Sequence, residues 1–282
     1  MVARDRGVID ISRLKVAMCQ MAVTDDKARN LARAREMIRT AGEEGSDIVV
    51  LPEMFNCPYD SQYFAPFAEE WPHGPSLNML RETAIEGRIL LVGGSIPERH
   101  QGSIFNTSFV FGPSGELLAR HRKVHLFDVD IPGGITFKES DTLSPGNDVT
   151  LAPLTGSSGK LGVAVCYDIR FPELFRRMAL GGAMLVAVPA AFNLTTGPAH
   201  WDLLFRTRAV DNQVFVVGVS PARLPGASYV AFGHSILVDP WGEVLAMAAA
   251  SEDLVVSEID LARVEQVRRE LPLLKHRRAE LY

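Results

Sequence analysis

Short apolar runs alternate along the chain with segments of helical periodicity. Runs that are apolar at nearly every position are typical of strands covered on both faces, and they predict strands at residues 16–21, 48–51, 89–92, 161–165, 184–188 and 214–219. Segments with apolar residues three and four positions apart predict helices at residues 26–44, 77–86, 172–181 and 200–212. Turn residues between apolar runs predict hairpins at residues 109–120, around GPSG, and 236–247, around DPWG. The pattern is that of an α/β protein.

The two halves of the chain repeat each other. The first half contains LPEMFN (51–56), LLVGGS (90–95) and SFVFGPSGELLA (108–119), and the second contains VPAAFN (188–193), FVVGVS (215–220) and SILVDPWGEVLA (235–246) in the same order. Two such units, with their sheets packed face to face and helices outside, would form a four-layer αββα sandwich. No linker-like composition separates the halves, so we predict a single domain spanning residues 1–282.

Composition narrows the class of protein. Hydrophobic residues make up 47% of the 282 residues and charged residues 22%, as in ordinary soluble domains. The formal net charge of −5, with one short basic cluster at residues 275–278, argues against a nucleic-acid partner. No stretch approaches the ~18 apolar residues of a membrane span, and the first ten residues lack the apolar core of a signal peptide. Three cysteines are too few for a disulfide framework, so we expect a soluble protein of a reducing compartment, the cytoplasm.

Glu53 comes just after a predicted strand and Pro52, at the kind of position where parallel sheets gather their binding groups. The equivalent position of the second half, after Pro189, holds Ala190. The fold therefore does not require a carboxylate there, which favours a functional role for Glu53. The alternative is a loop glutamate that caps a nearby turn.

Cys166 also follows a predicted strand, in LGVAVCYDIRFPEL (161–174), and polar and charged residues come directly after it. A thiol at a strand-end turn can lose its proton to a nearby base, and backbone N–H groups near Tyr167 could bind an anion. The alternative is an inert core cysteine. Neither Cys19, within a strand, nor Cys57, in a loop, precedes a comparable polar turn.

The residues alone do not identify the base that such a nucleophile needs. None of the seven histidines stands in a cysteine-hydrolase signature, and the G-x-S-x-G elbow of serine hydrolases is absent. His121 and His125 have the spacing of zinc ligands but no apparent third ligand, so we predict neither a metal site nor a cofactor. Without further context, Lys123 in RHRKVH reads as a surface lysine.

Three motifs in order resemble the carbon–nitrogen hydrolase (nitrilase) superfamily: LPEMF around Glu53, HRKVHLFD around Lys123 and GVAVCYDIRFPEL around Cys166. That superfamily has an αββα sandwich fold, which agrees with the internal repeat, and a Glu-Lys-Cys triad. Further stretches resemble its omega-amidase branch: FDVDIPGGITFKESDTLSPG (127–146), AAFNLTTGPAHW (190–201), RTRAVDNQVFVV (206–217) and ASYVAFGHS (227–235).

The resemblance implies a mechanism. Cys166 would attack an amide carbonyl after giving its proton to Glu53, which then protonates the departing ammonia. Lys123 and the N–H of Tyr167 would stabilise the oxyanion, and water would hydrolyse the thioester with Glu53 as base. Glu139 corresponds to a second glutamate that orients the substrate and the lysine. The alternative for Glu139 is a solvated loop residue.

The resemblance also implies a substrate class. An omega-amidase would hydrolyse the terminal amide of 2-oxoglutaramate and 2-oxosuccinamate, whose remote carboxylate needs a partner. Arg170 is the candidate, because a guanidinium binds a carboxylate with two hydrogen bonds; a structural ion pair with Asp168 or Glu173 is the alternative. Phe192 and Thr196 would line the same pocket, unless they belong to a packed loop. At least a homodimer is implied.

Two other functions stay open. One is another amide or N-carbamoyl hydrolase of the superfamily, such as a deaminated-glutathione amidase. The other is a catalytically silent binding subunit that keeps the fold. The intact triad counts against the silent subunit, and the stretch AFNLTTGPAHW favours the omega-amidase.

Overall fold

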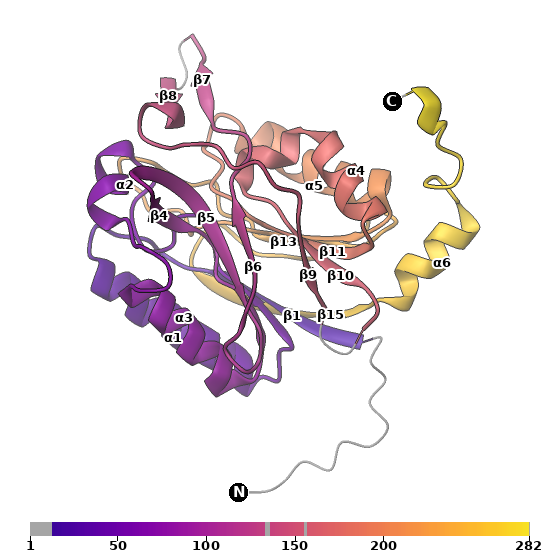
Figure 1. Cartoon of the computed structure of the whole chain (residues 1–282), viewed down its shortest axis with the longest axis horizontal. Coiled ribbons are helices and arrows are strands. Elements are labelled where there is room, and N and C mark those ends of the chain that lie inside the picture. The colour runs from indigo at the N-terminus through magenta and orange to yellow at the C-terminus, as the bar shows by residue number, and fades with distance from the viewer. Residues whose placement is uncertain (1–12, 133–135, 155–156, 282) are drawn as a thin grey trace, which may run out of the picture.

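Two β-sheets form the centre of the fold in the computed structural model, which describes residues 13–132, 136–154 and 157–281 (Figure 1). The first sheet contains β1 (Arg13–Gln20), β2 (Ile48–Val50), β3 (Leu90–Val92), β4 (Ile96–His100), β5 (Ser103–Phe111), β6 (Leu117–Arg122) and β15 (Asp253–Asp260). Strands β1, β2 and β3 run parallel, and β5 and β6 continue antiparallel. The first residues of the chain, residue 282 and part of the stretch 127–146 lie outside the described residues.

The second sheet repeats the arrangement of the first. It contains β9 (Thr150–Pro153), β10 (Lys160–Val163), β11 (Ala183–Pro189), β12 (Phe215–Val219), β13 (Ile236–Val238) and β14 (Val244–Met247). Strands β10, β11 and β12 run parallel, and β13 and β14 continue antiparallel. Strands β10 to β14 thus correspond to β1, β2, β3, β5 and β6, which confirms the repeat predicted from the sequence. β15 pairs antiparallel with β1 as β9 does with β10, and among the described residues β4 is the strand of the first sheet without a counterpart in the second.

Alternate side chains of the central strands point to opposite faces of each sheet, because a strand has a two-residue period. In β1, Val16 and Met18 belong to the core between the two sheets, whereas Ala17 and Cys19 pack toward the helices. Strand β11 divides its side chains between two cores in the same way. Nearly continuous apolar runs are therefore needed, since both faces of each sheet are covered.

Helices cover the outer face of each sheet. α1 (Lys27–Glu43) and α3 (Pro75–Gly87) lie on the first sheet, and α4 (Pro172–Leu180) and α5 (Gly197–Asn212) lie on the second (Figure 1). Local signals place their starts: the Asp26 side chain accepts a hydrogen bond from the N–H of Arg29 at 3.0 Å, and Pro172 stands in the first turn of α4. The order helices, sheet, sheet, helices is the predicted four-layer αββα sandwich.

The hydrophobic pattern does not predict several further elements. They are β4, β7 (Asp128–Asp130), β8 (Thr136–Lys138), β9, β15, α2 (Ser61–Phe67), α6 (Ala262–Glu270) and the 3₁₀ turns η1 (Glu139–Asp141), η2 (Cys166–Arg170) and η3 (Ala279–Leu281). Most are short or half exposed, so no continuous apolar run or helical stripe marks them. Among the helices of the described residues, none has the length and apolar character needed to cross a membrane.

Candidate active site

The side chains of Glu53, Lys123, Glu139 and Cys166 meet beyond the carboxyl ends of β2 and β10. Glu53 follows β2 and Cys166 follows β10, so a central parallel strand leads to each of them. Lys123 directly follows β6, and Glu139 opens the turn η1. The three charged residues are fully buried, and Cys166 is 5% exposed. A cluster of ionisable groups in a dry site is typical of an active centre.

The ammonium group of Lys123 lies between two buried carboxylates. Its Nζ atom donates to Oε1 of Glu53 at 3.0 Å and to Oε1 of Glu139 at 2.9 Å. Burial lowers the pKa of Lys123, but the charges of Glu139 and Glu53 raise it by more, so the lysine stays protonated. The surface position that its sequence context suggested is wrong.

Glu53 has one engaged oxygen and one spare oxygen. Besides Lys123, Oε1 accepts a hydrogen bond from Nδ2 of Asn106 at 2.8 Å, and the Asn106 carbonyl accepts from the N–H of Lys123 at 2.8 Å. Within the described residues Oε2 has no N–H or O–H partner, and the thiol of Cys166 interacts with this carboxylate. Burial raises the pKa of Glu53, Lys123 opposes the rise, and the charge of Glu139 adds to it. A spare oxygen on a carboxylate of raised pKa suits a proton acceptor.

Cys166 opens the turn η2 in a left-handed backbone conformation, with φ of 45°. Such a conformation costs about 1–2 kcal/mol for a residue with a Cβ atom, so the surrounding structure must hold it. Burial raises the pKa of the thiol and the charge of Glu53 raises it further, whereas Lys123 and a hydrogen bond from the backbone of Ala191 lower it. The net pKa lies well above the ordinary value, so the thiol needs a base to become a nucleophile.

Glu139 is the second carboxylate that accepts a hydrogen bond from the Lys123 ammonium. Its Oε1 atom accepts a hydrogen bond from the Tyr59 hydroxyl at 2.6 Å, and Oε2 accepts from the N–H of Phe127 at 2.6 Å. Glu139 is thus a buried residue of this site and not a solvated one. Tyr59 and Asn106 are the polar contacts that the sequence analysis missed. The one local signal is that Tyr59 lies in the turn NCPYD, six positions after Glu53.

A small cavity of about 40 Å³ lies beside this group, with Glu53, Tyr59, Ala191 and Tyr229 in its wall. Tyr59 and Tyr229 have ring centroids 4.8 Å apart, and the Tyr229 hydroxyl donates to the carbonyl of Ala191. The rest of the wall consists mostly of small and apolar side chains, and Cys166 is not part of it. Such a lining suits a small, uncharged group.

The chain is similar to known proteins over nearly its whole length. The family model of carbon-nitrogen hydrolases matches residues 15–269. The chain belongs to the carbon–nitrogen hydrolase family. It is 51% identical over 272 residues to omega-amidase NIT2 of Mus musculus, a match that covers 96% of this chain and 98% of that one.

Solved structures of this family have the same fold. Nit3 of Saccharomyces cerevisiae, a member of branch 10 of the nitrilase superfamily, matches with a TM-score of 0.87 and 43% identity, over 96% of this chain and all of that one. An amidase of Nesterenkonia sp. AN1, in which acrylamide has added to the active site cysteine, matches with a TM-score of 0.75 and 27% identity, over 95% of this chain and 98% of that one.

Arg170 of this carbon–nitrogen hydrolase has no carboxylate partner among the described residues. Its Nη1 atom donates to Nδ1 of His200 at 3.2 Å, and its guanidinium lies 5.1 Å from the ring centre of Phe192 and 5.6 Å from that of Tyr167. The ion pair with Asp168 or Glu173 that the sequence left open is not formed. The charge of Arg170 is therefore available to an anion.

Phe192 and Thr196 lie on the segment between β11 and α5. Phe192 is buried beside the Arg170 guanidinium, but neither of these residues lines the cavity beside Glu53, and nor does Thr196. Thr196 is also buried and precedes α5, where its N–H and hydroxyl donate to Oδ1 of Asn193 at 2.9 and 3.3 Å. Thr196 is thus tied into the loop structure, and Phe192 is the better placed of the two to contact a ligand of Arg170.

His121 and His125, which have the spacing of zinc ligands, both contact Asp168. The distances are 3.0 Å from Nε2 of His121 to Oδ2 and 2.8 Å from Nδ1 of His125 to Oδ1. No set of three or more His, Cys, Asp and Glu side chains in the described part of the chain has an arrangement that could hold a metal ion. The i, i+4 spacing places both histidines within hydrogen-bond distance of the Asp168 carboxylate.

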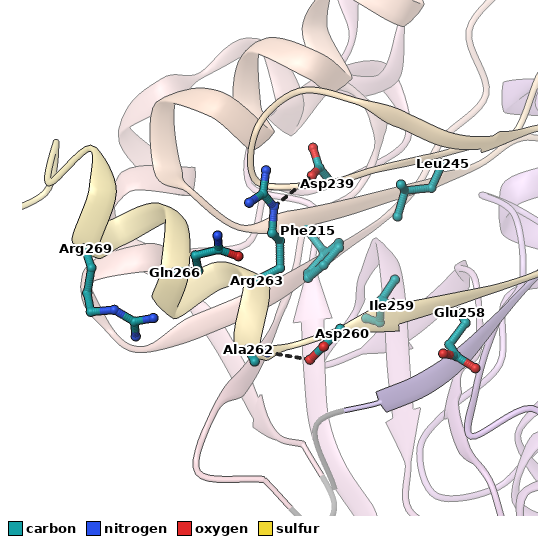
Figure 2. Close-up of a pocket in the computed structure, with 10 residues that line it drawn as sticks. All are labelled: Phe215, Asp239, Leu245, Glu258, Ile259, Asp260, Ala262, Arg263, Gln266 and Arg269. Carbon is teal, nitrogen blue, oxygen red and sulfur yellow. Dashed lines mark hydrogen bonds and ion pairs between the residues drawn. The ribbon is translucent and has the colours of Figure 1, made fainter. Parts of the chain in front are cut away.

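A second cavity, of about 420 Å³, lies between β15, α6 and the turn after β13 (Figure 2). Arg263 of α6 points across it to Asp239, with 3.6 Å between Nε and Oδ2, and the Asp260 side chain accepts from the N–H of Ala262 (Figure 2). None of the residues that line it lines the cavity beside Glu53. The Figure 2 cavity is therefore separate from the candidate active site.

Proposed function

We propose that this protein is an omega-amidase that hydrolyses the terminal amide of small 2-oxo dicarboxylate monoamides, 2-oxoglutaramate and 2-oxosuccinamate. The observation that carries this proposal is the buried ammonium of Lys123 between Glu53 and Glu139, next to the thiol of Cys166. The 51% identity to omega-amidase NIT2 of Mus musculus supports the substrate class.

In the first half of the proposed reaction, the thiol of Cys166 is acylated by the substrate. Glu53 takes the thiol proton through its spare oxygen while sulfur attacks the amide carbonyl. The oxygen that gains negative charge is stabilised by Lys123 and the N–H of Tyr167. When the C–N bond breaks, Glu53 gives the proton to the leaving nitrogen, which departs as ammonia.

In the second half, water hydrolyses the thioester. Glu53 takes a proton from the water as its oxygen attacks the carbonyl carbon, and the same oxyanion contacts act again. The C–S bond breaks, the thiol of Cys166 regains a proton from Glu53, and the carboxylic acid leaves. Glu139 keeps Lys123 in place throughout, because it accepts a hydrogen bond from Nζ and is itself held by Tyr59.

Arg170 is proposed to hold the remote carboxylate of the substrate. Its guanidinium has no carboxylate partner among the described residues and rests beside Phe192, which would pack on the substrate chain. A planar guanidinium matches a carboxylate with two parallel hydrogen bonds. Thr196, which precedes α5, is proposed to line the same pocket.

The molecular context is proposed as follows. The chain forms one carbon–nitrogen hydrolase domain, because the core between the sheets takes side chains from both halves. It acts as a homodimer or higher homo-oligomer, which the exposed apolar side chains of Leu180 on α4 and Leu203 and Val210 on α5 support. It works in the cytoplasm, in keeping with three free, buried cysteines.

The test is a panel of small amides with ammonia release as the readout. Ammonia should form fastest from 2-oxoglutaramate and 2-oxosuccinamate, and more slowly from neutral short amides. Faster ammonia release from N-carbamoyl compounds would assign the protein to another amidase class, and so would faster cleavage of deaminated glutathione, which is followed by mass spectrometry because its amides release an amine and not ammonia. No hydrolysis of any member of the panel would mean a silent binding subunit.

A further inference from the structure

The carboxylate of Asp168 accepts four hydrogen bonds although it is fully buried. Oδ1 accepts from the backbone N–H of His125 at 2.9 Å and from its Nδ1 at 2.8 Å. Oδ2 accepts from Nε2 of His121 at 3.0 Å and from the N–H of Val165 at 3.0 Å. All four acceptor positions of the carboxylate are used, so its charge is stabilised by N–H donors although no water reaches it.

The four donors come from two chain segments that carry candidate catalytic residues. His121 and His125 stand two positions before and two positions after Lys123, and Val165 immediately precedes Cys166. Asp168 itself belongs to the turn η2 that starts at Cys166. One carboxylate therefore ties the segment of the lysine to the turn of the thiol.

The bond to Val165 also bears on the conformation of Cys166. It closes the turn across Cys166, whose φ of 45° is unfavourable for a residue with a side chain. Such backbone conformations persist where neighbouring contacts over-determine them. The hydrogen bonds of Asp168 provide that restraint from both sides of the site.

Packing around the cluster reinforces the restraint. The His125 ring stacks on Phe171, with centroids 3.6 Å apart and planes 7° from parallel, and Nδ1 of His121 lies 2.9 Å from the Thr150 hydroxyl. Each imidazole is thus held in one orientation, with the proton that Asp168 needs on its facing nitrogen. The cluster is pre-organised and contains no water-exposed carboxylate.

We propose that Asp168 is a positioning residue that fixes the Cys166 turn relative to Lys123 through His121, His125 and Val165. The inference rests on the proposed function of Cys166 and Lys123 and adds a requirement to it. Asp168 does not touch the substrate. Its loss would misplace the thiol relative to the oxyanion contacts, and small misplacements of reacting groups reduce rates strongly.

The first test is Asp168→Asn, which keeps the shape but replaces one accepting oxygen with an N–H₂ donor. We expect kcat for 2-oxoglutaramate to fall about 10- to 100-fold with KM changed less than about threefold, because transition-state geometry is lost and binding is not. Alkylation of Cys166 by iodoacetamide, followed by mass spectrometry of its peptide, should slow in parallel. Cys19 and Cys57 are fully buried and do not compete.

The control is Asp239→Asn at the wall of the Figure 2 cavity. Asp239 is likewise buried and accepts two backbone N–H bonds, from Trp241 at 2.9 Å and Glu243 at 2.8 Å. It should lower the melting temperature but leave kcat and Cys166 alkylation within twofold of the parent. An equal fall in both variants would show general softening of the fold and overturn the proposal.

A second pair of variants covers the case in which Asp168→Asn does not fold. His125→Ala should reduce kcat, and His125→Asn should recover most of it, because the Asn amide can place an N–H near the Nδ1 position. Both variants lose the stack on Phe171, so the comparison isolates the hydrogen bond to Asp168. Equal activities of the two variants would overturn the proposed positioning role of Asp168.

The experiments can refute the proposed function and the positioning role of Asp168 independently of each other. If the parent releases no ammonia from any amide, the proposed function fails, and the alkylation rates still compare Asp168→Asn with the parent. If the parent is active, and the folded Asp168→Asn variant has the same kcat and the same rate of Cys166 alkylation, only the positioning role of Asp168 is wrong.

Discussion

Lys123 and Glu53 are 70 residues apart in the chain, yet the ammonium nitrogen of the first lies 3.0 Å from a carboxylate oxygen of the second in a fully buried site. Burying one charge without a partner would be very unfavourable. The buried pair is therefore stabilised by further hydrogen bonds: Lys123 also donates to Glu139, and Asn106 donates to Glu53. These residues therefore act as a unit, and the loss of one impairs the others.

Replacing the thiol should stop the reaction and leave the fold intact. Cys166→Ala should abolish ammonia release, because the nucleophile is gone while little packing is lost. The matched control is Cys19→Ala, in the core between the first sheet and its helices, which should keep activity and lose about 1 kcal/mol of stability. Turnover close to the parent in Cys166→Ala would refute the nucleophile assignment.

The losses from Glu53→Gln and Lys123→Ala should not add. Each should remove nearly all activity, and the double variant should be about as inactive as either single one, because the two residues act in one step with Cys166. Single-turnover rates of acyl-enzyme formation measure this. A double variant that is much slower than both single variants would indicate independent roles.

Tyr59→Phe tests a residue that the sequence analysis did not single out. It removes the hydroxyl that donates to Glu139 at 2.6 Å but keeps the ring contacts with Phe64 and Phe137. Loss of one hydrogen bond to a charged group is worth about 1.5–3 kcal/mol, so kcat should fall roughly 10-fold or more. Tyr63→Phe, whose ring packs on Phe67, is the control and should be neutral in the same assay.

Arg170→Lys separates the substrate class from the family chemistry. It replaces a planar fork with a point charge, so kcat/KM for 2-oxoglutaramate should fall about 10- to 150-fold. Neutral short amides have no carboxylate to lose, and their hydrolysis should change much less. The measured quantity is the ratio between the two substrates, and an equal fall for both would mean that Arg170 supports the turn of Cys166 instead.

The pH profile should report the raised pKa of Glu53. As the pH falls, a base with a raised pKa becomes protonated earlier than an ordinary glutamate. The midpoint of the acid limb of kcat/KM should therefore lie above about pH 4.3, the ordinary pKa of glutamate. Because the charge of Glu139 contributes to that rise, Glu139→Gln should move the acid limb to lower pH and also reduce the rate. Glu69→Gln, another buried carboxyl whose partners are Ser76 and Lys27, should leave the limb in place.

The sequence alone was sufficient to predict the layered fold. Strands covered on both faces must be apolar at nearly every position, and the repeated segments around Gly115 and Gly242 reveal two units of one design. It was also sufficient to single out Glu53 and Cys166, because each follows such a strand and the twin position of Glu53 holds Ala190. Lys123 was found only through the family resemblance, since a lysine in the basic stretch RHRKVH looks solvated.

Only the tertiary structure decided which polar residues meet. Tyr59, Asn106 and Asp168 lie on separate turns and strands, and no periodicity places one beside another. Their roles depend on long-range hydrogen bonds, such as the 2.6 Å contact between Tyr59 and Glu139 across 80 residues. The same holds for His121 and His125, whose zinc-like spacing turned out to match the two oxygens of one buried carboxylate. The hydrophobic pattern of a segment indicates which face of a helix or strand is apolar. The partner of a buried charge depends instead on how distant segments of the chain pack together.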